Sequence, residues 1–120
     1  MTPREEMFRL IEATWPKRYA FTPSEKVACG VGELFDHEAG KRFQVTAPTD
    51  SIDTLLAGLP VPREVETTKY GPEYRGWYGR NNQRNLLNLT DPFPTRPEAH
   101  AAASLAAVRH AVQQWKEAHP

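Results

Sequence analysis

The hydrophobic residues at the start of the chain recur at intervals of three and four positions. They are Met7, Phe8, Leu10, Ile11 and Trp15. This spacing is typical of one buried helical face. Thr2, Pro3 and Glu5 provide an N-cap, a first helical residue and the acidic partner of a capping box. The pattern therefore predicts an amphipathic helix from Pro3 to Ala13.

In the next segment, larger apolar residues alternate with small or polar ones, a pattern that is typical of strands. Pro16 to Lys26 is expected to be a loop anchored by Tyr19 and Phe21. Val27 to Phe35 is predicted as a strand, and its return strand runs from Arg42 to Ala47 across a loop that contains Gly40. On the first strand, the face expected to be buried carries Val27, Cys29, Val31, Glu33 and Phe35. The result is a predicted hairpin.

A short helix and three short strands follow. Ser51 to Ala57 is predicted to be helical, capped by Asp50 or Ser51 and ended by Gly58. Two turn sequences, Gly71-Pro72 and Asn81-Asn82, separate the strand candidates. The strand candidates are Arg63–Tyr70, Glu73–Gly79 and Arg84–Thr90. These segments predict an antiparallel meander.

The last predicted element is a long helix from Arg96 to Ala118, capped by Thr95 and Glu98. Its apolar stripe consists of Ala101, Leu105, Val108, Val112 and Trp115. The predicted order is α-β-β-α-β-β-β-α. We expect one α+β domain over residues 1–120, a layered sandwich whose mainly antiparallel sheet of about five strands packs against three helices. The pattern leaves open whether the helices cover one face of that sheet or both.

Composition narrows the functional classes. The 120 residues carry 15 basic and 15 acidic side chains, which argues against a generally basic nucleic-acid-binding surface. No apolar run approaches the ~18–20 residues of a membrane span, and the N-terminus lacks the apolar core of a signal peptide. The single cysteine, Cys29, excludes an internal disulfide. We therefore expect a cytoplasmic protein.

One stretch combines aromatic, Arg and amide side chains. Residues 74–90 contain three Arg and no acidic residue. Rings and guanidinium groups dominate protein-binding hot spots, and they also suit single-stranded nucleic acid, where rings stack on bases. The candidate binding residues are Tyr74, Arg75, Trp77, Tyr78, Arg80, Asn82 and Arg84. With a two-residue turn at Asn81-Asn82, Trp77 would lie opposite Leu86, and we expect the rings to face outward.

Other candidate chemistry is weaker. Glu33, Asp36 and His37 lie around the first hairpin loop and could hold a divalent metal. Their short loop spacing is more typical of a solvated turn. Cys29 is expected to be buried as a small hydrophobic residue. His100 and His110 are ten residues apart on the last helix, which is poor geometry for a shared metal, and both are expected to be solvated or partly packed.

The sequence therefore predicts a small non-enzymatic binding module without a cofactor. It would dock on or occlude a macromolecule, as inhibitors, immunity proteins and phage or mobile-element accessory proteins do. A protein partner is expected. Single-stranded nucleic acid or nucleotide binding is the alternative, and a metal enzyme using Glu33, Asp36 and His37 is the second alternative. The chain is expected to be a monomer, or a homodimer formed through a sheet edge or the long helix.

Overall fold

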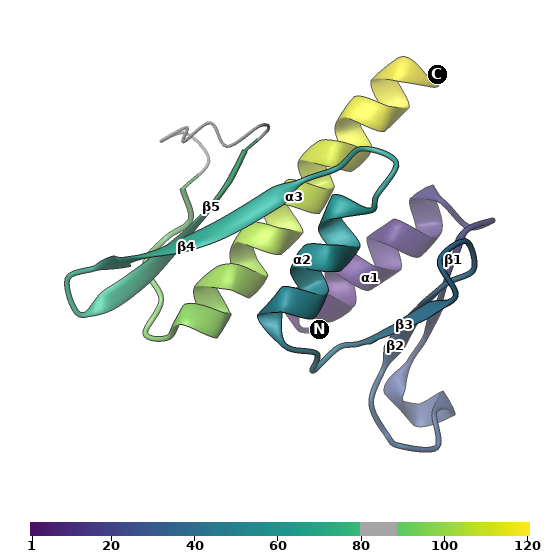
Figure 1. Ribbon diagram of the computed structural model, residues 1–120, viewed down its shortest axis with the longest axis horizontal. Coiled ribbons are helices and arrows are strands. Elements are labelled where there is room, and N and C mark those ends of the chain that lie inside the picture. Colours follow the sequence, from purple (N-terminus) through teal and green to yellow (C-terminus); the bar gives the residue numbers. More distant parts are fainter. Residues whose placement is uncertain (80–88) are drawn as a thin grey trace.

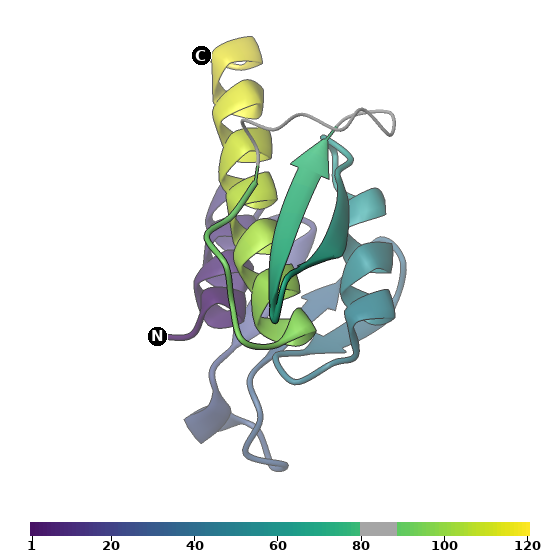
Figure 2. The same cartoon turned by 90° about the vertical axis from the view of Figure 1, so that its left-hand side faces the viewer.

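The computed structural model describes residues 1–79 and 89–120. Within them, three α-helices lie between two antiparallel sheets (Figures 1 and 2). The helices are α1 (Pro3–Thr14), α2 (Thr49–Ala57) and α3 (Arg96–Ala118). The strands are β1 (Tyr19–Thr22), β2 (Glu33–Asp36), β3 (Lys41–Gln44), β4 (Glu64–Tyr70) and β5 (Glu73–Gly79). The predicted α+β class is confirmed. The predicted order of helices and strands is also confirmed for the predicted elements that lie within the described residues.

The predicted single sheet is divided in two. Strands β1, β2 and β3 pair in that order, whereas β4 and β5 form a separate hairpin. Helix α3 packs against the hairpin, α1 packs against β1 and β2, and α2 contacts β3 and β4. Helices therefore cover one face of each sheet, which is how two small sheets can bury apolar faces in one core.

The core lies where these layers meet. Met7, Phe8 and Ile11 of α1 are fully buried, as are Ile52 and Leu56 of α2. Helix α3 adds small residues and Val108, also fully buried. Its predicted stripe is confirmed in part, because Leu105, Val108 and Val112 are buried whereas Ala101 and Trp115 are half-buried.

The helix ends follow local chemistry. The Oγ1 atoms of Thr2 and Thr95 accept hydrogen bonds from the backbone N–H groups of Glu5 and Glu98, so both predicted N-caps are confirmed. The cap predicted for α2 is wrong, because Pro48 occupies that position without a side-chain hydrogen bond. In Figure 1 the three helices run in a similar direction, and each has an acidic residue in its first turn, which offsets the aligned helix dipoles.

The first hairpin differs most from its prediction. Pairing in β2 begins only at Glu33, because a 3-10 turn, η1 (Ser24–Lys26), and Gly30, with a φ of 73°, redirect the chain before it. The expected burial pattern is also wrong: Leu34 and Asp36 are buried, and Cys29 is exposed. The segment expected to be a loop contains β1, whose Tyr19 is a buried anchor, as predicted.

Candidate functional site

The predicted binding residues on β5 are divided between the two faces of the β4–β5 hairpin. Val65, which is buried in the core, pairs with Tyr78, so Tyr78 points toward α3. Because side chains alternate along a strand, Tyr74 shares that face, and Arg75 and Trp77 lie on the opposite one. The expectation that all the rings face outward is therefore wrong.

Trp77 departs furthest from the predicted surface. Its side chain points away from α3, yet only 7% of the residue is exposed. Tyr78 is half-buried, with its ring 6.0 Å from the ring of His110. Neither ring is free to act as an exposed docking anchor.

The remaining predicted residues, Arg80, Asn82 and Arg84, lie outside the described residues, as does the predicted Asn81-Asn82 turn. Beyond this segment, Trp77 pairs with Leu89 and Tyr74 pairs with Phe93. The assumed pairing of Trp77 with Leu86 is therefore wrong by three residues. The strand predicted from Arg84 to Thr90 lies mostly outside the described residues.

The end of the hairpin where β4 turns into β5 carries a group of aromatic and basic side chains, which we call the hairpin-end surface; Tyr74 and Arg75 are half-buried and the others are exposed. It consists of Lys69, Tyr70, Tyr74, Arg75 and Arg96. Tyr70 is 61% exposed, and the Arg75 guanidinium lies over its ring at 4.5 Å. On the other face, Arg96 lies 5.1 Å over the ring of Tyr74 and donates a 3.0 Å hydrogen bond to Thr67 Oγ1.

Three of these residues, Lys69, Tyr70 and Arg96, are missing from the predicted set. Tyr70 ends β4, and Arg96 begins α3, so they are far apart in the sequence. The turn at Gly71-Pro72 returns β5 alongside β4, and the Tyr74–Phe93 bridge brings the start of α3 to the same place. No local pattern around Arg96 indicates this contact.

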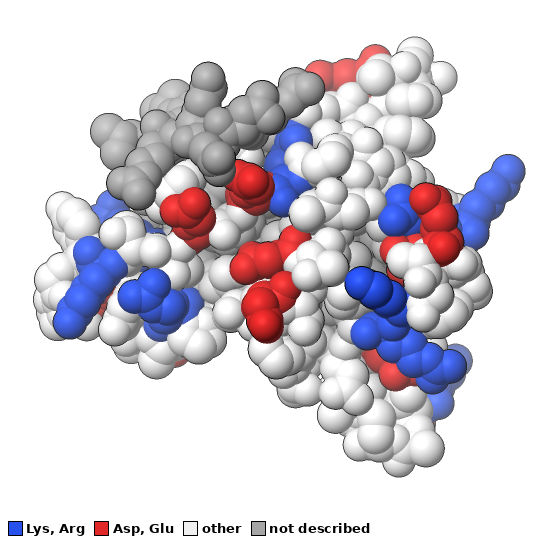
Figure 3. All heavy atoms as spheres, in the orientation of Figure 1, with Lys and Arg blue, Asp and Glu red and all other residues white. Residues whose placement is uncertain are grey.

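Charge is unevenly distributed over the face drawn in Figure 3. Basic side chains gather at the hairpin end, and acidic ones gather where β4 begins beside α2. The exposed acidic residues of those two elements include Glu64, Glu66, Asp50 and Asp53. The hairpin therefore has an acidic start and a mainly basic end, where Glu73 is also exposed.

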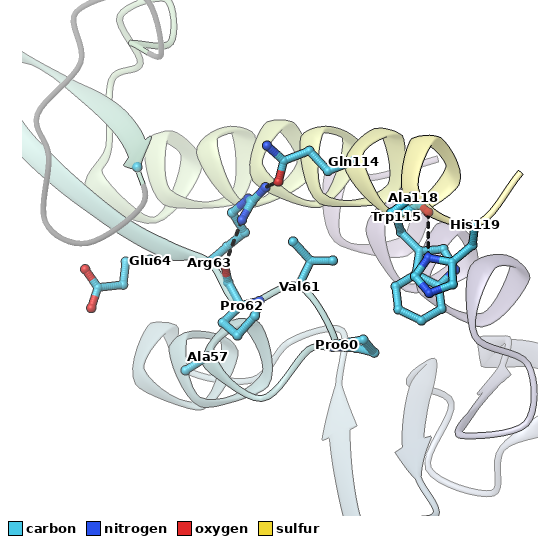
Figure 4. A pocket seen from close by; sticks show the side chains of 11 residues that line it. Ala57, Pro60, Val61, Pro62, Arg63, Glu64, Gln114, Trp115, Ala118 and His119 are labelled. Carbon is cyan, nitrogen blue, oxygen red and sulfur yellow. Dashed lines mark hydrogen bonds between the residues drawn. The ribbon is translucent and has the colours of Figure 1, made fainter.

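A pocket of about 560 Å³ opens between the α2–β4 connection and the C-terminal part of α3 (Figure 4). The buried Arg63 donates to Pro62 O at 2.9 Å and to Gln114 Oε1, and its Nη2 lies 3.1 Å from His110 Nδ1. Trp115 and His119 stack on the other side, with ring centroids 3.7 Å apart. The contacts of Arg63 tie the segment just before β4 to α3, and both groups of side chains line the pocket.

Three residues resemble a hydrolytic triad but are not arranged as one. His100 Nε2 lies 2.8 Å from Asp53 Oδ1, and His100 Nδ1 lies 3.4 Å from Ser104 Oγ. Ser104 is fully buried, and its hydroxyl donates to the backbone oxygen of His100 at 2.7 Å. A catalytic nucleophile must reach its substrate, which the buried Ser104 hydroxyl cannot do. The contacts among Asp53, His100 and Ser104 therefore serve to link α2 to α3. The expectation that His100 is solvated or only partly packed is wrong, since it is 4% exposed.

The loop proposed as a metal site is organised around an ion pair. Both carboxylate oxygens of Asp36 accept 3.1 Å bonds from Arg18, and backbone N–H groups of Glu38 and Ala39 also donate to it. Burial raises the pKa of Asp36, but these bonds outweigh it, so the pKa is below its usual value. Glu33 pairs with Arg42, and the ring of His37 packs against Phe35. In the described part of the chain, no three His, Cys, Asp or Glu side chains are grouped to hold a metal ion.

Comparison with known protein families, with characterised proteins and with solved structures finds no match to this chain. Among the described helices, none is long and apolar enough to cross a membrane.

Proposed function

We propose that this chain is a small non-enzymatic binding module that docks on a protein partner through the hairpin-end surface. The observation that carries the proposal is the pair of Tyr–Arg contacts at the exposed end of the hairpin, Arg75 over Tyr70 and Arg96 over Tyr74. Tyrosine and arginine are the side chains most enriched in binding hot spots, together with tryptophan. The surface replaces the sequence-predicted one, of which it keeps Tyr74 and Arg75.

The charge of this surface supports an acidic partner. Arg75 and Arg96 form no ion pair with a carboxylate among residues 1–79 and 89–120, although Arg18, Arg42 and Arg109 all do. Their guanidinium groups are held over rings, which limits the conformational entropy lost on binding. Such preorganised forks suit carboxylates on the partner.

The acidic residues beside the hairpin-end surface favour a protein partner over single-stranded nucleic acid. Glu64 and Glu66 are exposed on the same hairpin face as Arg75. These carboxylates would repel a phosphate backbone that followed this face. The zero net charge of the chain points the same way.

Action by occlusion fits this chemistry. The described groups that resemble catalytic machinery are buried or paired, as Asp36 is with Arg18 and His100 with Asp53. A compact domain with one basic, aromatic surface could block a partner in the way that inhibitors and immunity proteins do, and phage or mobile-element accessory proteins are a class with that role. The exposed Cys29 thiol suits the reducing cytoplasm.

The test is affinity capture from the native host, followed by binding measurements with the purified partner. We expect Arg75→Glu combined with Arg96→Glu to abolish binding while the chain stays folded, as judged by a cooperative melting transition. Lys17→Glu combined with Lys26→Glu is the matched control, because it makes the same change in net charge at exposed positions outside the surface.

Two outcomes would count against the proposal. Equal loss of binding in the control pair would assign the effect to net charge. Tight binding of a labelled oligonucleotide that weakens steeply between low and moderate salt would instead establish the nucleic-acid alternative.

A further inference from the structure

The hydrogen-bond pattern of β5 shows which backbone groups of β4 face outward. Tyr74 N–H donates to Phe93 O, and Tyr74 O accepts from Phe93 N–H, each at 2.8 Å. Backbone groups of Tyr74 therefore point away from β4. Because this direction alternates along a strand, Glu73, Arg75, Trp77 and Gly79 bond to β4.

The register then determines the free edge. The partners of those four residues on β4 are Tyr70, Thr68, Glu66 and Glu64. The residues between them, Val65, Thr67 and Lys69, must point their N–H and C=O groups to the opposite edge. No backbone hydrogen bond reaches these groups from the described residues. At Arg63 this edge is closed, because its N–H donates to Leu56 O at 3.0 Å.

We propose that two copies of this chain associate by antiparallel pairing of their β4 edges, around a two-fold axis at Thr67. Backbone groups that point outward on one copy can bond only to backbone groups that point outward on the other. The possible registers are therefore those that pair Val65, Thr67 and Lys69 with one another. In the centred register, Thr67 pairs with the second copy's Thr67, and Val65 pairs with its Lys69. The two hairpins then form one four-stranded sheet.

The charges of the hairpin favour a second copy as the occupant. In this register Glu66 lies opposite the second copy's Thr68, and Thr68 pairs with Arg75 within each hairpin. Glu66 and the second copy's Arg75 are thus about 10 Å apart between Cα atoms, with only the short Thr68 side chain between them. The acidic start of each hairpin therefore meets the basic end of the other.

The length of the edge also fits. Tyr70 is the last residue of β4, and the chain turns at Gly71, which has a φ of 64°. In the centred register the second copy's Gly71 arrives opposite Arg63, where Leu56 O already occupies the edge. Pairing therefore ends where the other hairpin turns away.

Residue-resolved hydrogen exchange of the purified chain tests the edge directly. We expect the amides of Val65, Thr67 and Lys69 to become protected as protein concentration rises. The amides of Glu64, Glu66, Thr68 and Tyr70 serve as an internal control, because their ladder to β5 protects them at every concentration. The mass in solution should approach twice 13.6 kDa.

Charge variants test the register. Glu66→Lys should raise the dimer dissociation constant about tenfold, because a two-fold axis makes each cross-strand charge contact twice. The double variant Glu66→Lys with Arg75→Glu should restore dimerisation, since it exchanges both partners. Lys26→Glu, far from the edge, should leave the constant unchanged.

The inference is overturned by a monomer at every concentration, or by a dimer in which the three outward amides stay unprotected. A dimer that the double variant does not restore would also contradict it. It goes beyond the proposed function, because it needs only the purified chain and no other partner. Failure of the wild-type chain to capture any host partner, with the dimer intact, would therefore refute the proposed function alone.

Discussion

Gly76 of β5 lies directly against Ala99 of α3, so closely that a β-carbon at position 76 would collide with the Ala99 carbonyl oxygen. The β-carbon added at position 76 would also lie 2.6 Å from the β-carbon of Ala103. Glycine here allows the hairpin to approach the helix backbone, and the fully buried Ala99 and Ala103 keep the other side of the contact small.

Gly76→Ala should therefore lower the free energy of unfolding by about 1–3 kcal/mol, because the clash is with backbone and with another β-carbon. Urea unfolding measures it. Gly58→Ala is the control, since a β-carbon there comes no closer than 3.5 Å to any other atom that could obstruct it. Equal stability of the two variants would show that the hairpin does not pack this tightly on α3.

Tyr19 carries a buried hydroxyl without a hydrogen-bond partner among the described residues. The residue is 1% exposed. Tyr19→Phe removes an unsatisfied polar group and keeps the ring, so it should raise the free energy of unfolding by about 1 kcal/mol. Tyr70→Phe, at an exposed tyrosine, should have no measurable effect. Destabilisation by Tyr19→Phe would mean that the hydroxyl has a bonding partner.

The same residue makes stability depend on alkaline pH. Burial raises the pKa of Tyr19 to about 12, whereas the unfolded chain releases this proton near pH 10. Between these values the folded state holds more protons than the unfolded state, so stability is lost as pH rises. Melting temperatures from pH 9 upward should fall more steeply for the wild-type chain than for Tyr19→Phe. Parallel slopes would contradict the assignment.

Asp36 should control stability at acid pH. Although burial acts to raise its pKa, the bonds from Arg18 and the backbone lower it overall. A lowered carboxyl pKa contributes stability that is present above about pH 4 and is lost as pH falls through the folded-state value. Asp36→Asn should lower neutral-pH stability by about 1–3 kcal/mol and flatten the acid limb of the melting curve. An unchanged acid limb would assign it to other carboxylates.

Trp77 should behave as a structural residue. Because only 7% of it is exposed, Trp77→Ala should cost about 3–5 kcal/mol of unfolding free energy, as large aromatic deletions do. Tyr70→Ala, on the exposed hairpin end, should change stability by less than about 0.5 kcal/mol. Similar losses of stability for the two variants would indicate that Trp77 is a surface residue that can contact a partner.

Local signals predicted most elements accurately. The strand Glu73–Gly79 and the helix Arg96–Ala118 have the bounds that the sequence indicated. The Thr–Pro–Glu patterns predicted the caps of α1 and α3 because capping depends on neighbours three residues apart. The segment before Glu33 misled the prediction because its alternating residues resemble a strand, while the positive φ of Gly30 and the 3-10 turn prevent pairing.

The candidate site was less predictable. The sequence identified the aromatic and Arg content around residue 75, but it could not show which faces those side chains would occupy. That depended on which hairpin face packs on α3, and on Arg96 arriving from the start of a distant helix to lie over Tyr74.

The sequence by itself determined the helices, the caps of α1 and α3, the turns at Gly40 and Gly71 and the α+β class, because these depend on periodicity and on contacts between near neighbours. Tertiary structure alone decided that the sheet would be two sheets, that Trp77 would be buried and that Arg18 would bind Asp36. Burial and long-range pairing depend on how separate elements pack together, and no stretch of the chain encodes that packing on its own.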